Sequence, residues 1–343
     1  MAPLLEVNNL SIEYETADGP DVKAVRDVSF TLERGDNFGL VGESGCGKTT
    51  TADAVIRNLP PNGHITEGEI IFDGQDLAKL SQKELQKVRW NDIAMVTQSA
   101  MASLNPVYTI NQQIREAIQI HEDNVSNSEA RERAEELFEL VGMDTDRVSD
   151  YPHQLSGGMR QRAIIAMALA LKPKLIIADE PTTALDVIVQ EQILHRINEL
   201  QNEINSSMLM ITHDISVVAE TCDKVAVMYG GKLMETGNVD EIFNNAHHPY
   251  TLGLQNAFPS IEGEKKDLVS IPGFPPNLTD PPKGCPFAAR CPWEAAECHQ
   301  PLPEIDLGDG HRVMCHEPEP FERIRGMSDD KELWQSQRDA VVE

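Results

Sequence analysis

The alternation of apolar and polar residues predicts strands at several points of the chain. Residues 10–14 and 28–32 alternate with period two, which indicates half-buried strands. A strand over 69–73 ends at the turn pair Asp73-Gly74, and 224–235 reads as a hairpin turned at Gly230-Gly231. Unbroken apolar runs predict strands buried on both faces; they cover 38–41, 93–96, 175–178 and 207–211.

Helical spacing follows several of these strands. One predicted helix has Glu and Arg opposite an apolar face, with Asn127 and Ser128 as its expected caps; that face comprises Ala130, Ala134, Leu137, Phe138 and Val141. Another opens after Ser156 and ends at Pro173, and a third covers 50–58. Buried strands alternating with helices predict an α/β fold, which places its chemistry at the carboxyl ends of the strands.

Length and composition allow roughly two domains, or one large domain with an extension, in 343 residues. No apolar run approaches the roughly 20 residues that span a bilayer. The first residues, MAPLLEVNNL, lack a basic region followed by a long apolar core. We therefore expect no signal peptide and a cytoplasmic protein.

The formal charge of −27, from 56 acidic and 29 basic residues, argues against binding to nucleic acid or anionic lipid. Membrane association would then go through a protein partner. The excess of carboxylates also suggests a surface adapted to high salt, and an ordinary acidic soluble protein is the alternative.

A glycine-rich loop follows the apolar run 38–41. It matches the phosphate-binding pattern G-x-x-x-x-G-K-[ST] in a strand-loop-helix context, with the residues Gly42, Glu43, Ser44, Gly45, Cys46, Gly47, Lys48 and Thr49, followed by Thr50. Backbone amides and the helix N-terminus would face phosphate oxygens. Lys48 is expected to reach the β- and γ-phosphates of ATP and Thr49 to bind Mg²⁺, with Cys46 as a bystander. A chance glycine-rich loop is disfavoured by a second motif downstream.

That second motif, QLSGGMRQRAIIAMALALKPKLIIADEPTTALD, covers 154–186. A turn opens a helix, and a buried strand then delivers Asp179 and Glu180 at its carboxyl end. The block resembles the signature, Walker B and D-loop of ATP-binding cassette (ABC) ATPases. The resemblance implies a RecA-like core with an antiparallel β subdomain and a helical subdomain.

In this family the acidic pair serves hydrolysis. By resemblance, Asp179 holds Mg²⁺ through water and Glu180 polarises the attacking water, in a reaction that depends mainly on positioning and charge neutralisation. The signature binds the γ-phosphate held by a partner subunit, which implies a dimer with two sandwiched ATP molecules. Its residues here are Leu155, Ser156, Gly157, Gly158 and Met159, and Asp186 belongs to the D-loop.

Three further residues gain roles only from the resemblance. Gln98, after the strand 93–96, would contact Mg²⁺ and water and begin the helical subdomain at about 99–160. His213, after the strand 207–211, matches the switch histidine that contacts the γ-phosphate, although a lone histidine there is more often structural. Tyr14 would stack on adenine, with a core tyrosine as the alternative.

The composition changes after Phe243. His248 begins an HPYT sequence, a proline-rich stretch covers 272–282, and a GC-x-F-x-x-RC pattern follows. These features resemble the C-terminal extension of the ATP-binding subunits of oligopeptide and dipeptide importers. We predict a nucleotide-binding domain at 1–245, an extension at 246–320 and a polar tail at 321–343, which is either a short helix or disordered.

Four cysteines lie within this extension, separated by five, six and sixteen residues: Cys285, Cys291, Cys298 and Cys315. In a cytoplasmic protein such clustering favours metal over disulfides. The tight C-x₂₋₄-C pairs of zinc sites are absent, and related importer ATPases are thought to carry a [4Fe–4S] centre. Zinc and free or disulfide-paired thiols stay open, as does substitution by His299, His311 or His316. Because the cysteine site lies outside the cassette, we expect ATP binding to survive the replacement of any one of these cysteines.

The function implied by the resemblance is ATP hydrolysis that powers di- or oligopeptide uptake from the cytoplasmic face of the membrane. The implied partners are two transmembrane permease subunits, a second ATP-binding subunit, which in this family is usually a related but different chain, and indirectly a solute-binding protein. Import of nickel or a sugar is an alternative. A soluble ABC ATPase of DNA repair or translation is disfavoured, because the chain has one cassette and no long coiled-coil insertion.

Overall fold

The structure, a computed structural model, divides the chain into two compact units. It describes residues 2–97, 103–181, 190–191, 194–195, 197–199, 201, 205–257, 271–317, 321–328 and 330–334. The first unit contains residues 1–32, 38–78 and 212–343, and the second contains 33–37 and 79–211. Both combine strands with helices, which confirms the predicted α/β class.

An antiparallel sheet in the first unit has the order β2-β1-β4-β5. The strands are β1 (Leu5–Tyr14), β2 (Val22–Leu32), β4 (Gly63–Phe72) and β5 (Gln75–Asp76). Residues 10–14 and 28–32 lie in β1 and β2 as predicted, and 69–72 form the end of β4. The first half of β4 is largely exposed and has no apolar pattern, because it is held by backbone pairing with β1.

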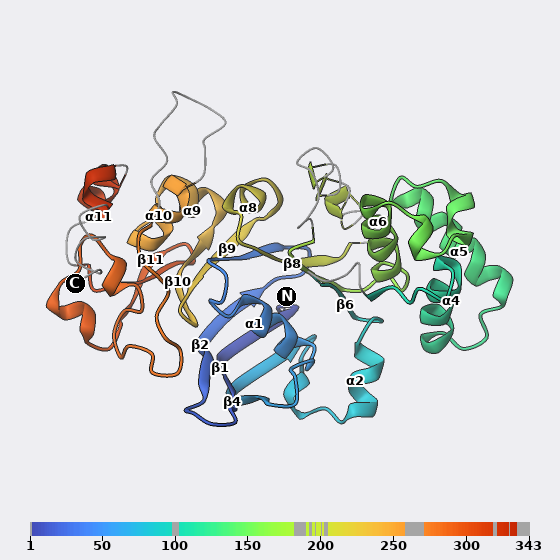
Figure 1. The fold of residues 1–343 in the computed structure, drawn as a ribbon, viewed down its shortest axis with the longest axis horizontal. Coiled ribbons are helices and arrows are strands. Elements are labelled where there is room, and N and C mark those ends of the chain that lie inside the picture. The colour runs from blue at the N-terminus through green and yellow to red at the C-terminus, as the bar shows by residue number, and fades with distance from the viewer. Residues whose placement is uncertain are drawn as a thin grey trace. The chain divides into compact units, whose positions relative to one another are not determined.

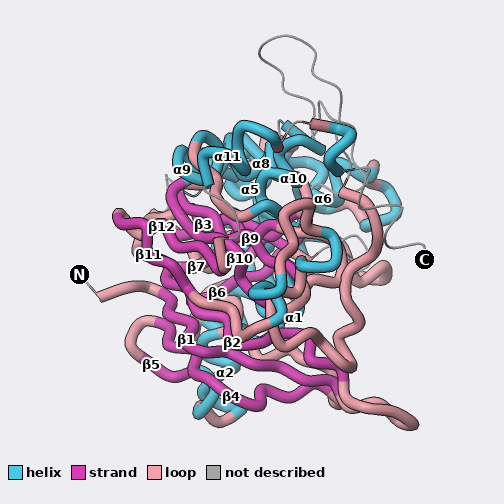
Figure 2. The backbone as a smooth tube through the Cα atoms, turned by 90° about the vertical axis from the view of Figure 1, so that its left-hand side faces the viewer, coloured by secondary structure: helices cyan, strands magenta, loops and turns pink. Residues whose placement is uncertain are grey.

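A second sheet in the first unit has the strand order β11-β12-β10-β9-β3. Its strands are drawn in magenta in Figure 2. Its strands are β3 (Asn37–Val41, in this unit from Phe38), β9 (Lys224–Tyr229), β10 (Lys232–Asn238), β11 (Glu304–Gly308) and β12 (His311–Met314). β9 runs parallel to β3, and the predicted β9–β10 hairpin is confirmed. β12 pairs with β10 through Glu235 and Thr236, so residues of the extension continue the sheet of the cassette.

The helices of this unit are α1 (Lys48–Val55), α8 (Ile215–Thr221), α9 (Val239–Asn244), α10 (Pro249–Ala257) and α11 (Phe321–Met327), with the 3-10 helices η4 (Ala288–Arg290) and η5 (Ala296–His299). One hydrophobic cluster, here called the shared core, joins β9, β10 and α8–α11 to the cysteine segment 285–315. Tyr229, Tyr250, Phe287 and Trp334 are each at most 1% exposed in it. The tail therefore begins as a helix that packs on the shared core (Figure 1).

The second unit contains the parallel strands β6 (Ile93–Val96), β7 (Leu175–Asp179) and β8 (Ser207–Thr212, in this unit to Ile211). Every residue of β7 and β8 is buried, as the unbroken apolar runs predicted. The helices are α2 (Gln82–Val88), α4 (Ile110–His121), α5 (Asn127–Leu140) and α6 (Gly157–Ala168), with short 3-10 helices at Thr145–Ser149 and Pro152–Gln154. A further 3-10 helix, Leu77–Lys79, has residues in both units. α4, α5 and α6 pack against one another (Figure 1).

Three predicted helix ends need correction. The helix predicted over 50–58 is α1, which ends at Val55 because Arg57, with a φ of 51°, lies outside the helical range. The cap of α5 is Ser126, whose side chain accepts the Glu129 N–H while Glu129 accepts the Ser126 N–H; this reciprocal capping box outcompetes Asn127 and Ser128. α6 ends at Ala168 rather than at Pro173, and a turn with Lys172 at a φ of 49° leads into β7.

Candidate functional site

The glycine-rich loop joins β3 to α1 in the first unit. Gly47 has a φ of 109°, and a Cβ there would lie 2.5 Å from the Ala24 carbonyl oxygen. A Cβ on Gly42 would lie 2.0 Å from the Met228 carbonyl oxygen. Both positions therefore require glycine, and the backbone amides after them lead into the N-terminus of α1, which is a suitable cradle for phosphate.

Lys48 lies across this loop with only 6% of its surface exposed. Its Nζ donates to the carbonyl oxygens of Gly42, at 2.7 Å, and Glu43, at 3.0 Å. The ammonium is thus held over the loop by two backbone oxygens. Cys46 is buried beside Lys48, whose Nζ lies 3.6 Å from the Cys46 Sγ, and burial raises the pKa of the thiol. Its role as a bystander stays a prediction.

Tyr14 and His213 are also in the first unit. The Tyr14 hydroxyl donates to Thr50 Oγ1 at 3.2 Å, so the end of β1 lies beside the first turn of α1. His213 is exposed where the chain leaves β8, and the following Asp214 caps α8 by accepting the Ser216 N–H at 2.9 Å. The geometry puts Tyr14 next to the loop and leaves the predicted roles of both residues as predictions.

The acidic pair lies in the second unit, at the end of β7. Asp179 is 2% exposed, and Glu180 has a φ of 46°, an uncommon conformation for a residue other than glycine. The Glu180 N–H donates to the Ile211 carbonyl at 2.8 Å, which fixes the turn. A strained acid at the carboxyl end of a buried parallel strand is typical of a functional site.

The signature residues open α6 in the same unit. Ser156 is the cap of this helix, and its Oγ accepts the Met159 N–H at 3.3 Å. Gln161, which sequence reasoning missed, is 5% exposed and donates to the carbonyl of Pro181, the residue after Glu180. This hydrogen bond ties the signature helix to the acidic turn. Its only signal in the sequence is a polar residue on the buried face of a helix.

Gln98 and Asp186 lie outside the described residues. Among those described, the loop, Tyr14 and His213 are in one unit, and the acidic pair and the signature are in the other.

The four cysteines are buried, each 5–7% exposed, and none forms a disulfide. Burial raises the pKa of the Cys285 thiol to about 12 and that of Cys315 to about 11, and each thiol lies within electrostatic reach of others in the group. Backbone amides point at the sulfurs: the Glu317 N–H donates to Cys315 Sγ at 3.3 Å. The structure thus brings the predicted cysteines together.

The three histidines considered as substitute ligands have other partners. His299 is exposed and bonds to Glu294, and the half-buried His316 bonds to the Gln300 carbonyl. His311 is 2% exposed and bonds through Nε2 to Glu235 at 2.8 Å.

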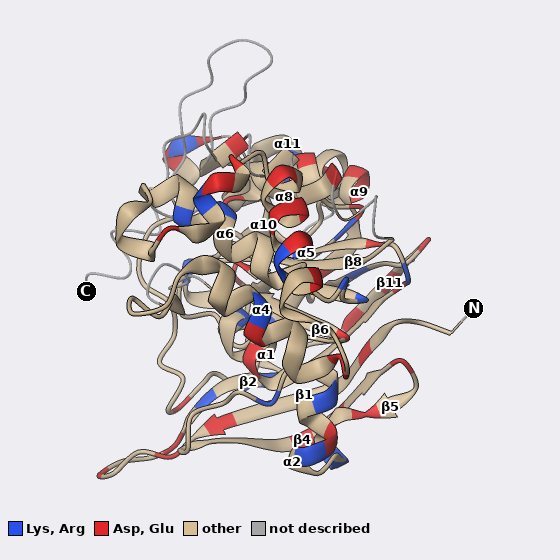
Figure 3. Ribbon diagram, turned by 90° about the vertical axis from the view of Figure 1, so that its right-hand side faces the viewer, with Lys and Arg blue, Asp and Glu red and all other residues tan. Residues whose placement is uncertain are grey.

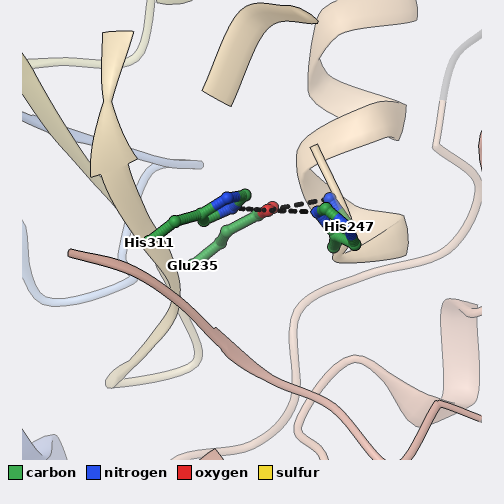
Figure 4. A group of neighbouring side chains, drawn as sticks. All are labelled: Glu235, His247 and His311. Carbon is green, nitrogen blue, oxygen red and sulfur yellow. Dashed lines mark hydrogen bonds and ion pairs between the residues drawn. The ribbon is translucent and has the colours of Figure 1, made fainter. Parts of the chain in front are cut away.

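Glu235 is the centre of a buried polar network with His247 and His311 (Figure 4). Its two carboxylate oxygens accept the backbone N–H groups of His247, at 2.8 Å, and His248, at 3.1 Å. Burial lowers the pKa of His247, whose surroundings also include the charges of Glu235, His311 and Arg325. Hydrogen bonds therefore satisfy the carboxylate and lock β10, β12 and the start of α10 together.

The extension also reaches the phosphate-binding loop, which sequence reasoning missed. Arg290 donates from Nη1 and Nη2 to the two carboxylate oxygens of Glu43, at 2.7 and 3.0 Å. The Glu43 N–H donates to the Tyr250 hydroxyl at 2.9 Å. These bonds connect the extension directly to the loop, and the survival of ATP binding after loss of a cysteine stays a prediction.

Comparison with known proteins gives consistent matches. A family model described as ABC transporter matches residues 25–183, and one described as oligopeptide/dipeptide transporter, C-terminal region, matches 234–298. The oligopeptide transport ATP-binding protein OppD of Bacillus subtilis is 49% identical over 90% of this chain and 87% of its own length. The dipeptide transport ATP-binding protein DppD of Lactococcus lactis is 51% identical over 84% of this chain and 82% of its own.

A solved structure is also similar. It is a dimeric, post-hydrolysis state of the ATP-binding cassette MJ0796 bound to ADP and phosphate, with a TM-score of 0.62 and 27% identity. The match covers 68% of this chain and 98% of that one. Within the described part of the present chain, no helix is long and apolar enough to cross a bilayer.

Proposed function

The chain belongs to the family of ABC transporter ATP-binding subunits, and on this premise we propose that it hydrolyses ATP to power di- or oligopeptide import through a membrane complex. The observation that carries the proposal is the identity of 49% with an oligopeptide transport ATP-binding protein across 90% of the chain. The match of residues 234–298 to the oligopeptide/dipeptide C-terminal model supports the peptide branch over nickel or sugar import. A soluble ABC ATPase has no comparable support.

The proposed roles in nucleotide binding and hydrolysis are shared between residues of the two units. Lys48, already held over the loop, would bind the β- and γ-phosphates, and Tyr14 would stack on adenine beside α1. Mg²⁺, when bound, neutralises charge on the transferred phosphoryl group; Thr49, Gln98 and Asp179 would hold it. The remaining residues act on water and on the partner's nucleotide.

Glu180 would orient the attacking water, and His213 would contact the γ-phosphate. The amides at the start of α6 would bind the γ-phosphate of a second cassette, with Asp186 crossing to that partner. This mode of action requires two cassettes and two permease subunits, with a solute-binding protein acting indirectly. It places the chain on the cytoplasmic face of the membrane. We retain 1–245 as the proposed nucleotide-binding domain, followed by the extension and the tail.

The test is reconstitution of the chain with its permease subunits, partner cassette and binding protein in vesicles. We expect ATP-dependent uptake of labelled peptides, and loss of uptake in Glu180→Gln. ATP-dependent uptake of nickel or a sugar without peptide uptake would move the function to the alternative solutes. No stimulation of ATPase activity by the permease would contradict a transport role.

The four cysteines are proposed to hold a [4Fe–4S] cluster. Four thiols that are each buried and free of disulfides lie in one segment of the chain. Their sequence spacing lacks the tight C-x₂₋₄-C pairs usual for zinc, and four cysteine thiolates are the usual ligands of a [4Fe–4S] cluster. The cysteine set therefore favours a cluster over zinc.

Anaerobic purification tests the cluster. We expect brown protein with broad visible absorbance and about four iron and four sulfide per chain, lost when Cys298 is replaced by serine. Colourless protein with one equivalent of zinc would replace the cluster with a zinc site. Colourless, metal-free, folded protein would remove the metal proposal.

A further inference from the structure

Arg290 is a buried cation whose partners come from the extension and from the phosphate-binding loop. It is 5% exposed, and a guanidinium at this depth needs its donors satisfied. Besides Glu43, it donates to the Tyr229 hydroxyl at 2.9 Å and to the carbonyls of Pro272, at 2.7 Å, and Ile271, at 3.3 Å. Arg290 is thus built into the fold at a fixed position.

The pair of Arg290 with Glu43 is bidentate, the geometry that combines strength with orientation. The two residues are 247 positions apart, and the Glu43 side chain is 26% exposed against 5% for Arg290. Because the cation is buried, its position is set by the shared core. The more exposed glutamate, and with it the loop, is the element that is positioned.

Glu43 in turn positions the phosphate-binding lysine. Its backbone N–H is fixed by the Tyr250 hydroxyl at 2.9 Å, and its carbonyl accepts Lys48 Nζ at 3.0 Å. A shift of Glu43 would therefore move one of the two backbone oxygens that hold the ammonium. The chain of contacts runs from Arg290 through Glu43 to Lys48.

Arg290 is also rigidly attached to the cysteine segment. It ends η4 and directly precedes Cys291. Its N–H donates to the Phe287 carbonyl at 2.9 Å, and its guanidinium lies 5.5 Å from the Tyr229 ring centre and 5.9 Å from that of Phe287, within the range of cation–π attraction. Any change that moves this segment moves the cation that holds the loop.

We propose that Arg290 is a positioning residue of the ATP site, through which the C-terminal extension and nucleotide binding are thermodynamically coupled. The inference rests on the proposed function, because it assigns regulation to the same loop. Since coupling is reciprocal, the extension sets the affinity of the loop for nucleotide, and nucleotide stabilises the extension. Oxidation or metal loss in the cysteine segment would then change the affinity of the loop for ATP.

The test compares the full-length chain with Glu43→Gln, Arg290→Gln and the double variant. Arg312→Gln is the matched control, since Arg312 is on β12 with a side chain 54% exposed and pairs only loosely with Glu304, at 3.4 Å. The readouts are the Kd for a fluorescent ATP analogue, the Tm, and hydrogen exchange of the amides of 287–290. Glu43→Gln keeps a polar group of equal shape at a partly exposed position, so it separates loop positioning from folding.

We expect either single variant to raise the Kd about tenfold or more, within the 5–150-fold range typical of coupled sites. The double variant should be no weaker than the singles, because both remove the same contact. Nucleotide should slow exchange at 287–290 in the wild type and not in Glu43→Gln. Arg312→Gln should match the wild type.

Variants with a lower Tm and an unchanged Kd would overturn the proposal, because Arg290 would then stabilise the fold without positioning the loop for nucleotide. Additive losses in the double variant would also overturn it. If Arg290→Gln does not fold, the Kd and exchange of Glu43→Gln decide alone. A wild-type chain that binds no nucleotide would contradict the proposed function instead, which keeps the two failures distinguishable.

Discussion

Replacing Phe287 by alanine would test whether the extension and the cassette unfold as one body. Phe287 lies between Cys285 and Cys291 and is fully buried. Its ring packs edge-on against Tyr229 of β9, at a centroid distance of 5.3 Å, and lies 5.2 Å from Tyr250. The ring therefore fills space between the cysteine segment and a strand of the cassette.

The expected loss follows from these contacts. Truncating a buried phenylalanine costs about 3–5 kcal/mol, and aromatic pairs add roughly 0.5–1.5 kcal/mol beyond the buried area. We take about 4 kcal/mol for the loss of stability, because the cost of truncating a buried phenylalanine already includes part of the aromatic-pair energy. At roughly 2–4 °C per kcal/mol for a unit of this size, the Tm should fall by about 10 °C.

The assay follows thermal unfolding with two probes in a Trp90→Phe background. Tryptophan fluorescence then reports on Trp293 and Trp334, both buried in the shared core. A bound fluorescent nucleotide reports on the loop. Both transitions should move together in Phe287→Ala and less in Phe287→Leu.

Phe274→Ala is the control, because Phe274 belongs to the same extension but is 87% exposed. The free energy of unfolding of Phe274→Ala should change by no more than about 0.5 kcal/mol, as expected for a surface substitution, so its Tm should stay close to that of the wild type. If the tryptophan signal of Phe287→Ala is lost early while nucleotide is released at the wild-type temperature, the two parts unfold separately. Equal effects of the two variants would refute the packing argument.

Three further predictions concern catalysis, pH and salt. Glu180→Gln should bind ATP in a trapped dimer with hydrolysis nearly abolished, whereas Lys48→Ala should weaken binding; near-normal turnover of Glu180→Gln in the purified transporter would reject the assignment. The pKa of His247 is lowered by burial, so its contribution to stability is full above the unfolded pKa of about 6.5 and is lost as pH falls below it. Between pH 7 and pH 5 the Tm of His247→Phe should therefore fall less than the Tm of the wild type, and an equal fall in the two proteins would contradict this. The Tm of the wild type should rise as salt goes from about 0.1 M to 1 M, and a flat curve would indicate an ordinary acidic protein.

The salt prediction has a structural basis in the acidic helices. Figure 3 shows acidic residues on α5, α8 and α9. On α5, Glu132 and Glu136 are exposed and one turn apart, a spacing at which like charges repel. Screening relieves such repulsion in the folded state more than in the expanded chain, where the charges are farther apart.

Local patterns were sufficient for the elements whose residues are near one another in sequence. The apolar runs over 175–178 and 207–211 became fully buried strands, because a strand covered on both faces must be apolar throughout. The glycine-rich loop was predictable since its backbone geometry excludes side chains at Gly42 and Gly47. By contrast, β11 and the first half of β4 are held by backbone pairing at exposed positions, which leaves no apolar signature.

The pairing of Arg290 with Glu43 had no local signal, because the GC-x-F-x-x-RC pattern that contains Arg290 does not indicate a partner. An arginine before a cysteine and a glutamate in a glycine-rich loop are both ordinary in isolation. Their meeting depends on β12 pairing with β10 and on the position of α10, neither of which the sequence pattern predicted. Long-range ion pairs of this kind are specified by the whole fold and become visible only in it.

The cysteine segment illustrates how such long-range packing changes an energetic argument. Its sequence is rich in proline and short of apolar residues, and from the sequence alone a bound metal could supply the free energy that orders it. In the fold, Phe287 and Trp293 pack with Trp334 of the tail, and the Trp334 Nε1 donates to the Ser328 carbonyl at 2.8 Å. Apolar burial therefore contributes to ordering this segment even before any metal binds. Removing one cysteine should accordingly loosen the metal site more than the surrounding core, so protease sensitivity after Cys298→Ser is expected to stay below that after Phe287→Ala.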